Sequence, residues 1–192
     1  MINKQNFNNL VQKFSEYDKQ REALIKKSRD VLKASKQLIY SLHRNDKKAA
    51  KTNLASIKTQ FNQLTAIAKK DPSLQSEGSF KVAAQEYVEA VCYYGYVVDK
   101  KIPTDKALKV SPSHYLLGLF DLTGELVRKA INDAIRGRTE SVLEIKQFVE
   151  ELYGQMIRFD FRESELRRNF DRVSRDLKKL EELVLNLKLK NA

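Results

Sequence analysis

Apolar residues recur at three- and four-residue intervals along almost the whole chain, and this helical period limits the possible folds more than any other feature. The pattern is clearest near the C-terminus, where one apolar stripe runs between arginines and lysines: Leu166, Phe170, Val173, Leu177, Leu180, Val184 and Leu187. The alternation of apolar and polar residues that is typical of strands is absent. The sequence therefore predicts an all-α protein.

Breaks in this period mark the connections between helices. Proline or glycine stands at four of them, at Pro72, Pro103, Pro112 and Gly137, and a short junction of aromatic and charged residues lies near 158–163. The chain holds only three prolines and six glycines, so the connections are short. We predict one domain over residues 1–192, built as an up-and-down bundle of seven helices. The expected helices lie near 3–44, 46–69, 72–100, 104–109, 112–136, 140–158 and 163–190.

Composition removes several kinds of chemistry. One cysteine, Cys92, excludes a disulfide framework and a cysteine-based zinc site, and we assign it to core packing. The two histidines, His43 and His114, are far apart and are expected at surface or capping positions. The N-terminus has no signal-peptide pattern, and the most apolar stretch, 115–127, is too short to span a bilayer. We expect a cytoplasmic protein without a membrane segment.

Charge is the first indication of function. The chain has 36 Lys and Arg against 25 Asp and Glu, a net charge of +11, and basic proteins of this size often bind polyanions. Either of two basic clusters could follow the phosphates of a nucleic acid; the alternative is a solvated helix face. The clusters are Lys26, Lys27, Arg29, Lys33 and Lys36, and Arg167, Arg168, Arg172, Arg175, Lys178 and Lys179.

Acidic residues interrupt a helix that is otherwise apolar nearly all round. Asp121 and Glu125 lie one turn apart in this helix, on one face. Gly118 and Gly124 lie beside them, where we expect room for close backbone approach or for a bound group. Because charged groups inside an apolar stripe are costly unless they are paired or bound to a cation, this pair is a candidate functional site.

A second acid pair, Glu86 and Glu89, shares a face with apolar residues that begin at Val82. Carboxylate oxygens without histidine suit a hard divalent cation, so two such pairs could form a metal site. The alternative is neutralisation by Arg or Lys of neighbouring helices, with Arg128 as a clear candidate partner.

Six segments, spread over nearly the whole chain, carry a resemblance to a known family. They are Ser28-Arg29-Asp30, Ser41-Leu42-His43-Arg44, Gln85-Glu86-Tyr87-Val88-Glu89-Ala90-Val91, Tyr115-Leu116-Leu117-Gly118, Asp121-Leu122-Thr123-Gly124-Glu125-Leu126 and Leu177-Lys178-Lys179-Leu180-Glu181-Glu182. Together they resemble the translin/Trax family, and specifically its Trax branch.

The resemblance implies a translin-like subunit of seven helices that forms a hollow homo-oligomer, an octamer, and binds single-stranded RNA or DNA. It also implies that Glu86, Glu89, Asp121 and Glu125 are the catalytic residues and metal ligands of an endoribonuclease that uses Mg²⁺, or Mn²⁺ in its place. In translin proper this acidic set is incomplete, so the complete set here favours a catalytic subunit. One departure is His114, which replaces an acid of the family pattern.

These observations lead to one prediction and two alternatives. We predict a Mg²⁺-dependent endoribonuclease that cleaves single-stranded RNA inside a homo-oligomeric barrel. One alternative is a non-catalytic scaffold that binds single-stranded RNA or DNA, and the other is a structural assembly protein whose acids only form salt bridges. Basic residues would position the strand without reading bases, and the candidates are Arg128, Arg167, Arg168, Arg172 and Arg175.

Overall fold

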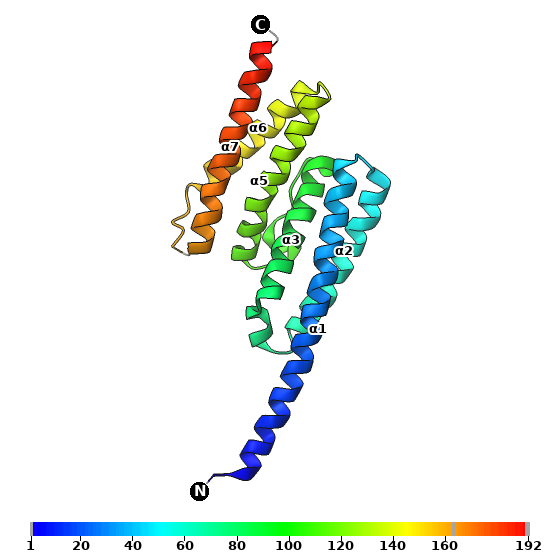
Figure 1. The fold of residues 1–192 in the computed structure, drawn as a ribbon, viewed down its shortest axis with the longest axis vertical. Coiled ribbons are helices and arrows are strands. Elements are labelled where there is room, and N and C mark those ends of the chain that lie inside the picture. The colour runs from blue at the N-terminus through cyan, green and yellow to red at the C-terminus, as the bar shows by residue number, and fades with distance from the viewer. Residues whose placement is uncertain (1, 163, 191–192) are drawn as a thin grey trace. The chain divides into compact units, whose positions relative to one another are not determined.

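A computed structural model describes residues 2–162 and 164–190, which are helical over most of their length (Figure 1). Within these residues there is no strand, so the all-α prediction is confirmed. Contacts divide the chain into two compact units, Met1–Tyr87 and Val88–Ala192, and a single domain over 1–192 stays a prediction. The elements are α1 (Lys4–His43), α2 (Lys47–Ala68), η1 (Pro72–Ser76), α3 (Gly78–Tyr94), η2 (Gly95–Asp99), α4 (Asp105–Leu108), α5 (Pro112–Ile135), α6 (Thr139–Met156) and α7 (Ser164–Lys190).

The seven α-helices of the described residues match the expected ranges within about two residues, except for the range 72–100. That range contains a 3₁₀ turn, an α-helix and a π-helical turn. Asp71 caps the 3₁₀ turn, because its carboxylate accepts a hydrogen bond from the Ser73 N–H at 2.8 Å. Glu77 then adopts an extended conformation (φ −62°, ψ 132°), so the helix does not continue and α3 begins at Gly78.

The first unit is built on α1 and α2, which run antiparallel side by side (Figure 1). Asn45 has a φ of 58°, which reverses the chain direction, and the Asp46 carboxylate then caps α2 by accepting from the Ala49 N–H at 3.0 Å. The ring of Phe61 stacks on that of Tyr87 with centroids 3.9 Å apart. The buried core of the pair consists of Leu24, Val31, Leu38, Leu42, Ala50, Ile57, Phe61 and Leu64.

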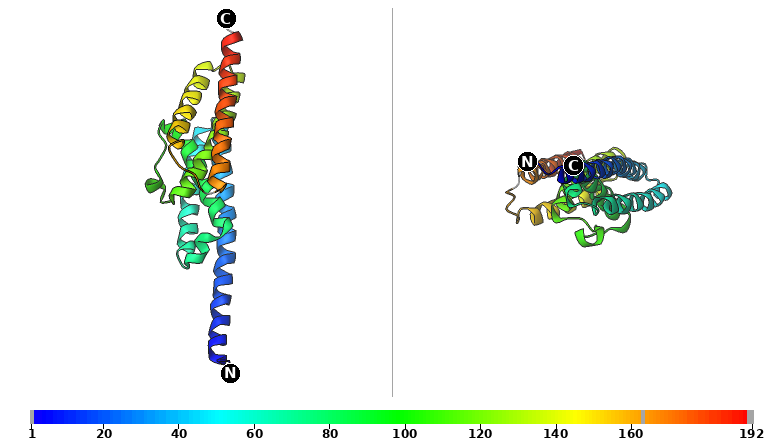
Figure 2. Two further views of the ribbon diagram at one scale, coloured as in Figure 1. Left: turned by 90° about the vertical axis from the view of Figure 1, so that its left-hand side faces the viewer. Right: turned by 90° about the horizontal axis from the view of Figure 1, so that it is seen from below.

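The N-terminal part of α1 extends beyond the end of α2 (Figures 1 and 2). Residues 2–16 of this part are all exposed, whereas Leu24 is the first fully buried side chain of the helix. The structure thus places large apolar residues, among them Phe7 and Phe14, in solvent.

The second unit is built on α5, α6 and α7, which pack against one another with alternating direction (Figures 1 and 2). The expected burial of the apolar stretch in α5 is confirmed from Leu117 to Phe120. Around Phe170 gather the rings of Phe120, Tyr153 and Phe161. The buried core includes Phe120, Leu122, Leu126, Ile145, Val149, Val173 and Leu180.

A π-helical turn, η2, ends α3 and leads to α4. At its first residue, Gly95, a Cβ would lie 2.5 Å from the carbonyl oxygen of Lys101, so only glycine fits. Lys100 has a φ of 56° and ends the turn. No helix in the described part of the chain is long and apolar enough to cross a membrane.

Candidate functional site

The acid pair of α5 lies where the sequence predicts it. Ser111 caps the helix by accepting from the His114 N–H at 3.3 Å, and Pro112 occupies the first helical position. Asp121 and Glu125 follow three to four turns later, and both side chains are half-buried. The helix therefore presents two carboxylates, one turn apart, at the edge of the core.

Asp121 forms an ion pair with Arg172, which α7 brings to it from 51 residues away. The guanidinium donates to the Asp121 carboxylate, and the two side chains are 39% and 19% exposed respectively. Because both partners keep some access to water, this pair can open at lower cost than a fully buried one. The structure thus neutralises the charge of Asp121 with a cation, Arg172, that another cation could replace.

A second polar contact ties α5 to α7 one turn away. The Thr123 hydroxyl donates to the buried carboxylate of Asp176 at 3.0 Å, and Lys179 donates to the same carboxylate at 3.1 Å. A Cβ at Gly124 would lie 3.9 Å from Asp176, an ordinary contact distance. Of the two possibilities expected at Gly124, a close backbone approach is not found, because the neighbour is a side-chain carboxylate, and room for a bound group stays a prediction.

Glu125 has a cation from its own helix. Arg128 lies one turn later and places a guanidinium nitrogen 3.7 Å from the Glu125 carboxylate, as the neutralisation alternative predicts. Glu125 also lies near the phenol of Tyr93 on α3: burial raises the pKa of Tyr93, and the charge of Glu125 raises it further. The charge of Glu125 is therefore felt at Tyr93, in the second half of α3.

The other two acids lie three residues apart on α3. Glu89 is buried, with 8% exposure, and Glu86 is half-buried. Val82, expected in the apolar stripe beside them, is 47% exposed, so that part of the prediction is wrong. A charged side chain as buried as Glu89 is rare unless it has partners, and interactions are made by both Glu86 and Glu89.

The oxygen donors suit Mg²⁺ in kind. Protein magnesium sites commonly use one or two carboxylates, with waters and substrate phosphates completing the shell, and half-buried Asp121 and Glu125 can serve in this way. Across residues 2–162 and 164–190, no group of three or more His, Cys, Asp and Glu side chains is arranged to hold a metal ion. A metal at these acids would therefore depend on water and phosphate oxygens for most of its shell.

The basic residues of α7 divide into two kinds. Arg167, Arg168 and Arg175 are exposed, whereas Arg172 is half-buried on Asp121. Positions 168, 172 and 175 follow one another at helical intervals of four and three, so these arginines form a row on one face of α7. Arg128 is 58% exposed and belongs to the ion pair with Glu125.

The structure also reveals a buried acid that sequence reasoning missed. Asp133, 2% exposed, accepts hydrogen bonds from Lys129 at 2.7 Å, from Arg138 at 2.5 Å and from Ser141 at 2.7 Å. Burial alone would raise the pKa of Asp133, but these hydrogen bonds and the two cations outweigh it and lower the pKa. The only signal in the sequence is the Lys129–Asp133 spacing of four residues.

Two other side chains are buried in the core, and for Cys92 this confirms the expected packing role. Cys92 is fully buried, and burial raises the pKa of its thiol to about 12, so it is not a reactive thiolate. Tyr93 is fully buried as well, so its ring packs in the core.

Comparisons with known proteins place these residues in a wider context. The sequence profile of the Translin family matches residues 19–191. An uncharacterized protein of Methanocaldococcus jannaschii is 30% identical over 159 residues, which cover 80% of this chain and 69% of that protein. Translin-associated protein X of Pongo abelii is 27% identical over 172 residues, which cover 69% of this chain and 59% of that protein.

Solved structures agree with the sequence comparison. The crystal structure of apo-NeC3PO has a TM-score of 0.89 and 31% identity, with 96% of this chain and 97% of that chain covered. The structure of an AfC3PO–duplex RNA complex has a TM-score of 0.86 at 21% identity, covering 96% of this chain and 97% of that one, and shows the likeness of fold alone.

Proposed function

The chain belongs to the Translin family, and we propose that it is a catalytic, Trax-like subunit: a Mg²⁺-dependent endoribonuclease that cleaves single-stranded RNA within a homo-oligomeric barrel. The chain spans 59% of the length of the Translin-associated protein X relative, so the activity is proposed for this chain on its own residues. The four acids Glu86, Glu89, Asp121 and Glu125 are proposed as the catalytic and metal-binding set.

The observation that carries the proposal is the partly exposed ion pair of Asp121 with Arg172, in which a metal ion could take the place of the guanidinium. A purely structural acid is expected to be buried in the core with its charge paired, whereas Asp121 keeps 19% exposure and pairs with an arginine, Arg172, that is itself 39% exposed. A half-buried carboxylate next to a partly exposed cation suits a site that must take up a metal and a phosphate in turn.

Bound Mg²⁺ would lower the pKa of a coordinated water and neutralise charge on the scissile phosphate. The chain would contribute the acids that hold it, with Asp121 and Glu125 on α5 and Glu86 and Glu89 on α3. Release of Arg172 from Asp121 would free a guanidinium beside the phosphate. Arg168 and Arg175, on the same face of α7, would continue the contact along the RNA backbone without reading bases.

The test is RNA cleavage by wild-type protein with Mg²⁺ and with a chelator, compared with Asp121→Asn and Glu125→Gln. Each swap keeps the shape and removes a negative charge, so we expect cleavage to fall at least about a hundredfold, or about 2.7 kcal/mol of transition-state stabilisation. The matched control is Asp171→Asn, because Asp171 is an exposed acid next to Arg172 in sequence and is expected to leave cleavage unchanged.

Binding separates this proposal from its alternative. The arginine partners of Asp121 and Glu125 favour a second candidate, a non-catalytic scaffold for single-stranded RNA or DNA. If the acids are catalytic, the two variants still bind RNA, or bind it more tightly, since negative charge has been removed from a phosphate site. Wild-type protein that binds RNA but does not cleave it in Mg²⁺ or Mn²⁺ would establish the scaffold instead.

Salt dependence tests the backbone contacts. If arginines of α7 contact phosphates, log affinity falls with log salt by about 0.7 for each phosphate neutralised on a single strand. Each of Arg168→Gln and Arg175→Gln should then reduce the slope by about that amount, equally for unrelated RNA sequences. A flat salt dependence would remove backbone tracking from the proposal.

The proposed assembly is a closed homo-oligomer, an octamer, with the acids toward RNA. The exposed apolar residues of α1, including Phe7, Val11 and Phe14, support association because a soluble monomer rarely exposes so many neighbouring apolar side chains. Light scattering at micromolar concentration should give a multiple of the 22.2 kDa chain mass.

A further inference from the structure

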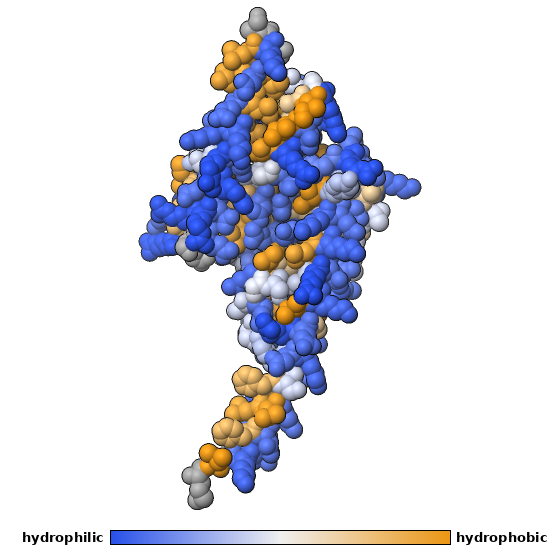
Figure 3. Space-filling model, viewed as in Figure 1, coloured by the Kyte–Doolittle hydropathy of each residue, from blue (hydrophilic) through white to orange (hydrophobic). Residues whose placement is uncertain are grey.

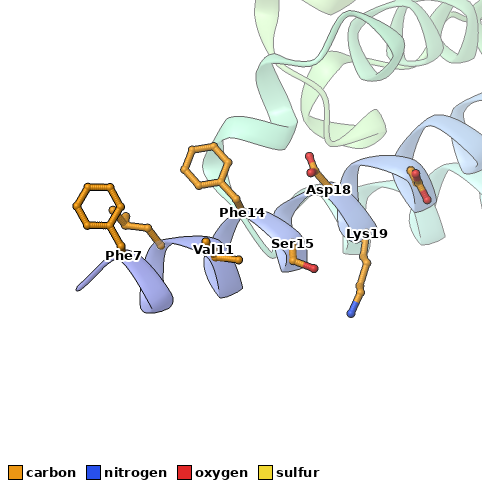
Figure 4. A pocket seen from close by; sticks show the side chains of 8 residues that line it. Phe7, Val11, Phe14, Ser15, Asp18 and Lys19 are labelled. Atoms are coloured by element: carbon orange, nitrogen blue, oxygen red, sulfur yellow. The ribbon is translucent and has the colours of Figure 1, made fainter. Parts of the chain in front are cut away.

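The N-terminal part of α1 carries a large exposed apolar face. Phe7, Leu10, Val11 and Phe14 are 54%, 39%, 68% and 67% exposed, and all four line one shallow groove along the helix. Figure 3 shows an orange patch at this end of α1, and Figure 4 shows the rings of Phe7 and Phe14 on the same side of the helix. Single exposed apolar residues are ordinary, but a continuous group of this size indicates an interaction surface.

This face continues the buried face of the same helix. One heptad row runs along α1 at alternating steps of three and four residues: Phe7, Leu10, Phe14, Tyr17, Arg21, Leu24, Ser28, Val31, Ser35, Leu38 and Leu42. From Leu24 onward every member of the row is buried, in the stretch where α1 packs with α2. This is the spacing with which two helices pack side by side, so the exposed members are suited to a second helix.

The change from covered to exposed occurs at Tyr17 and Arg21. The Tyr17 hydroxyl and the Arg21 Nε donate to the Glu77 carboxylate at 2.9 and 2.8 Å. Both hydrogen bonds lower the pKa of Glu77, and the bond from Arg21 has the larger effect. Asn3 caps the other end by accepting from the Asn6 N–H at 3.1 Å. The exposed stretch is thus a capped helix anchored at its inner end.

The charge of this stretch argues against a polyanion as its partner. Residues 4–22 hold four basic and three acidic side chains: Lys4, Lys13, Lys19 and Arg21, and Glu16, Asp18 and Glu22. The whole chain, by contrast, carries +11. RNA or an anionic bilayer would favour a strongly basic border around the apolar face, which is not present here. A nearly neutral apolar helix is the better match.

We propose that this face is an interface between two copies of the chain, in which α1 of one protomer packs antiparallel on α1 of its partner. The proposal deepens the homo-oligomeric part of the proposed function and does not depend on RNA cleavage. In this arrangement Phe7 packs against Tyr17 of the partner subunit, and Leu10 against Phe14 of the partner subunit. Two-fold symmetry repeats both contacts, so the surface closes on itself.

The antiparallel arrangement matches the residues on one flank of the heptad row, whereas on the other flank Lys13 lies near Lys13 of the partner subunit, where both long side chains can extend into solvent. It places Val11, the most exposed of the four, against Val11 of the partner subunit. It places Lys4 opposite Asp18 of the partner subunit, an oppositely charged pair at each end. A parallel pair would instead separate the two Val11 side chains to opposite flanks, so Val11 distinguishes the two arrangements.

The first experiment measures particle mass. Phe14→Asp should lower the mass from light scattering or sedimentation at least twofold at equal concentration, because a charge would be buried in the interface. The matched control is Gln12→Asp, which introduces the same charge on the opposite side of the same helix and should keep the wild-type mass. Far-UV circular dichroism should be the same for both variants. Phe14→Asp protein of wild-type mass would overturn the proposal.

The second experiment measures the geometry. Val11→Cys should form a disulfide-linked dimer with a mild added oxidant, since the natural Cys92 is fully buried and does not compete. Asn9→Cys, on the opposite side of the helix, should not. Adding Phe14→Asp to Val11→Cys should abolish the cross-link. Loss of mass in Phe14→Asp without a Val11→Cys cross-link would overturn the antiparallel pairing.

The outcomes separate this inference from the proposed function. A wild-type protein that is monomeric at micromolar concentration overturns both the interface and the homo-oligomer. A wild-type oligomer that Phe14→Asp leaves intact overturns the interface alone. If Phe14→Asp keeps the mass but loses binding to vesicles that contain anionic lipid, the face belongs to a membrane surface and the proposal is overturned. RNA cleavage is not a readout in any of these arms.

Discussion

Two aspartates of the same helix, Asp121 and Asp133, meet very different surroundings. Asp133 is sealed in the core and accepts hydrogen bonds from two cations and a hydroxyl, all from residues within eight positions of it. Asp121 is half-buried and meets Arg172 from a distant part of the chain. Both are acids within an apolar helix, and the sequence pattern alone does not separate them.

This difference in burial and in partners distinguishes a structural carboxylate from a candidate functional one. The hydrogen-bonding capacity of Asp133 is largely used by local partners, so its charge serves to join the end of α5 to the start of α6. Asp121 has a partner that is itself accessible to water, so its charge can be offered to another cation.

The largest expected effect is on stability, from Asp133→Asn. Removing this charge leaves Lys129 and Arg138 beside a neutral amide, and breaking such a buried network costs about 3 kcal/mol of unfolding free energy. Chemical denaturation measures this cost. Asp121→Asn, the matched control on the same helix, should cost less than about 1 kcal/mol because its pair is partly exposed. Equal losses for the two variants would show that Asp121 is structural as well.

The pH dependence sharpens the same contrast. Because the pKa of Asp133 is lowered in the folded state, its contribution is complete above the unfolded-state pKa and is lost as pH falls through the folded-state value. The stability gap between wild type and Asp133→Asn should therefore be constant near neutral pH and narrow below about pH 4. Urea denaturation across this range provides the measurement, and a gap that widens on acidification would contradict the assignment.

Arg172→Gln tests whether the guanidinium of Arg172 competes with a metal ion for Asp121. If Arg172 competes with a metal for Asp121, its removal should lower the Mg²⁺ concentration needed for half-maximal cleavage by about threefold to tenfold, which corresponds to about 0.7–1.4 kcal/mol. Calorimetric titration of Mg²⁺ without RNA gives an independent readout. Arg175→Gln, on the same face of α7 and exposed, is the control for the titration without RNA, where it should leave Mg²⁺ binding unchanged. An increased Mg²⁺ requirement in both readouts would contradict competition at Asp121.

The smallest expected effect is at Gly124, beside the Asp121 pair. A Cβ there meets only the carboxylate of Asp176 at 3.9 Å, so Gly124→Ala should be tolerated and raise stability by about 0.5–1 kcal/mol through helix propensity. The thermal midpoint checks this. Gly95→Ala is the contrasting change, because its Cβ would collide with the Lys101 carbonyl, and it should lower the midpoint.

Most of the helical architecture could be predicted from local signals. Caps at Asp46, Asp71, Thr104 and Ser111 begin elements through hydrogen bonds that span at most three residues, so the sequence alone reveals them. The interruption at Glu77 could not be predicted from the apolar period, which continues across it. The carboxylate of Glu77 is held by Tyr17 and Arg21, and contacts from a residue 60 positions away leave no local pattern.

The candidate site divides in the same way. Spacing alone predicted that Asp121 and Glu125 share a face and that Arg128 lies within reach of Glu125, because an α-helix fixes neighbours three and four residues apart. Spacing did not predict Arg172 as the partner of Asp121, since α7 offers Arg168, Arg172 and Arg175 on one face. It also missed Asp176, whose partner Thr123 belongs to another helix.

The sequence by itself thus determined the helices, their buried stripes and the acids that interrupt them, because these depend on a period of 3.6 residues and on bonds within one turn. Tertiary structure decided which cation meets which acid, and that the heptad row of α1 is covered from Leu24 onward but exposed at Phe7 and Phe14. Those outcomes depend on where each helix ends against its neighbour and on its rotation about its own axis. Both are set by the packing of side chains distant in sequence, which no local pattern encodes.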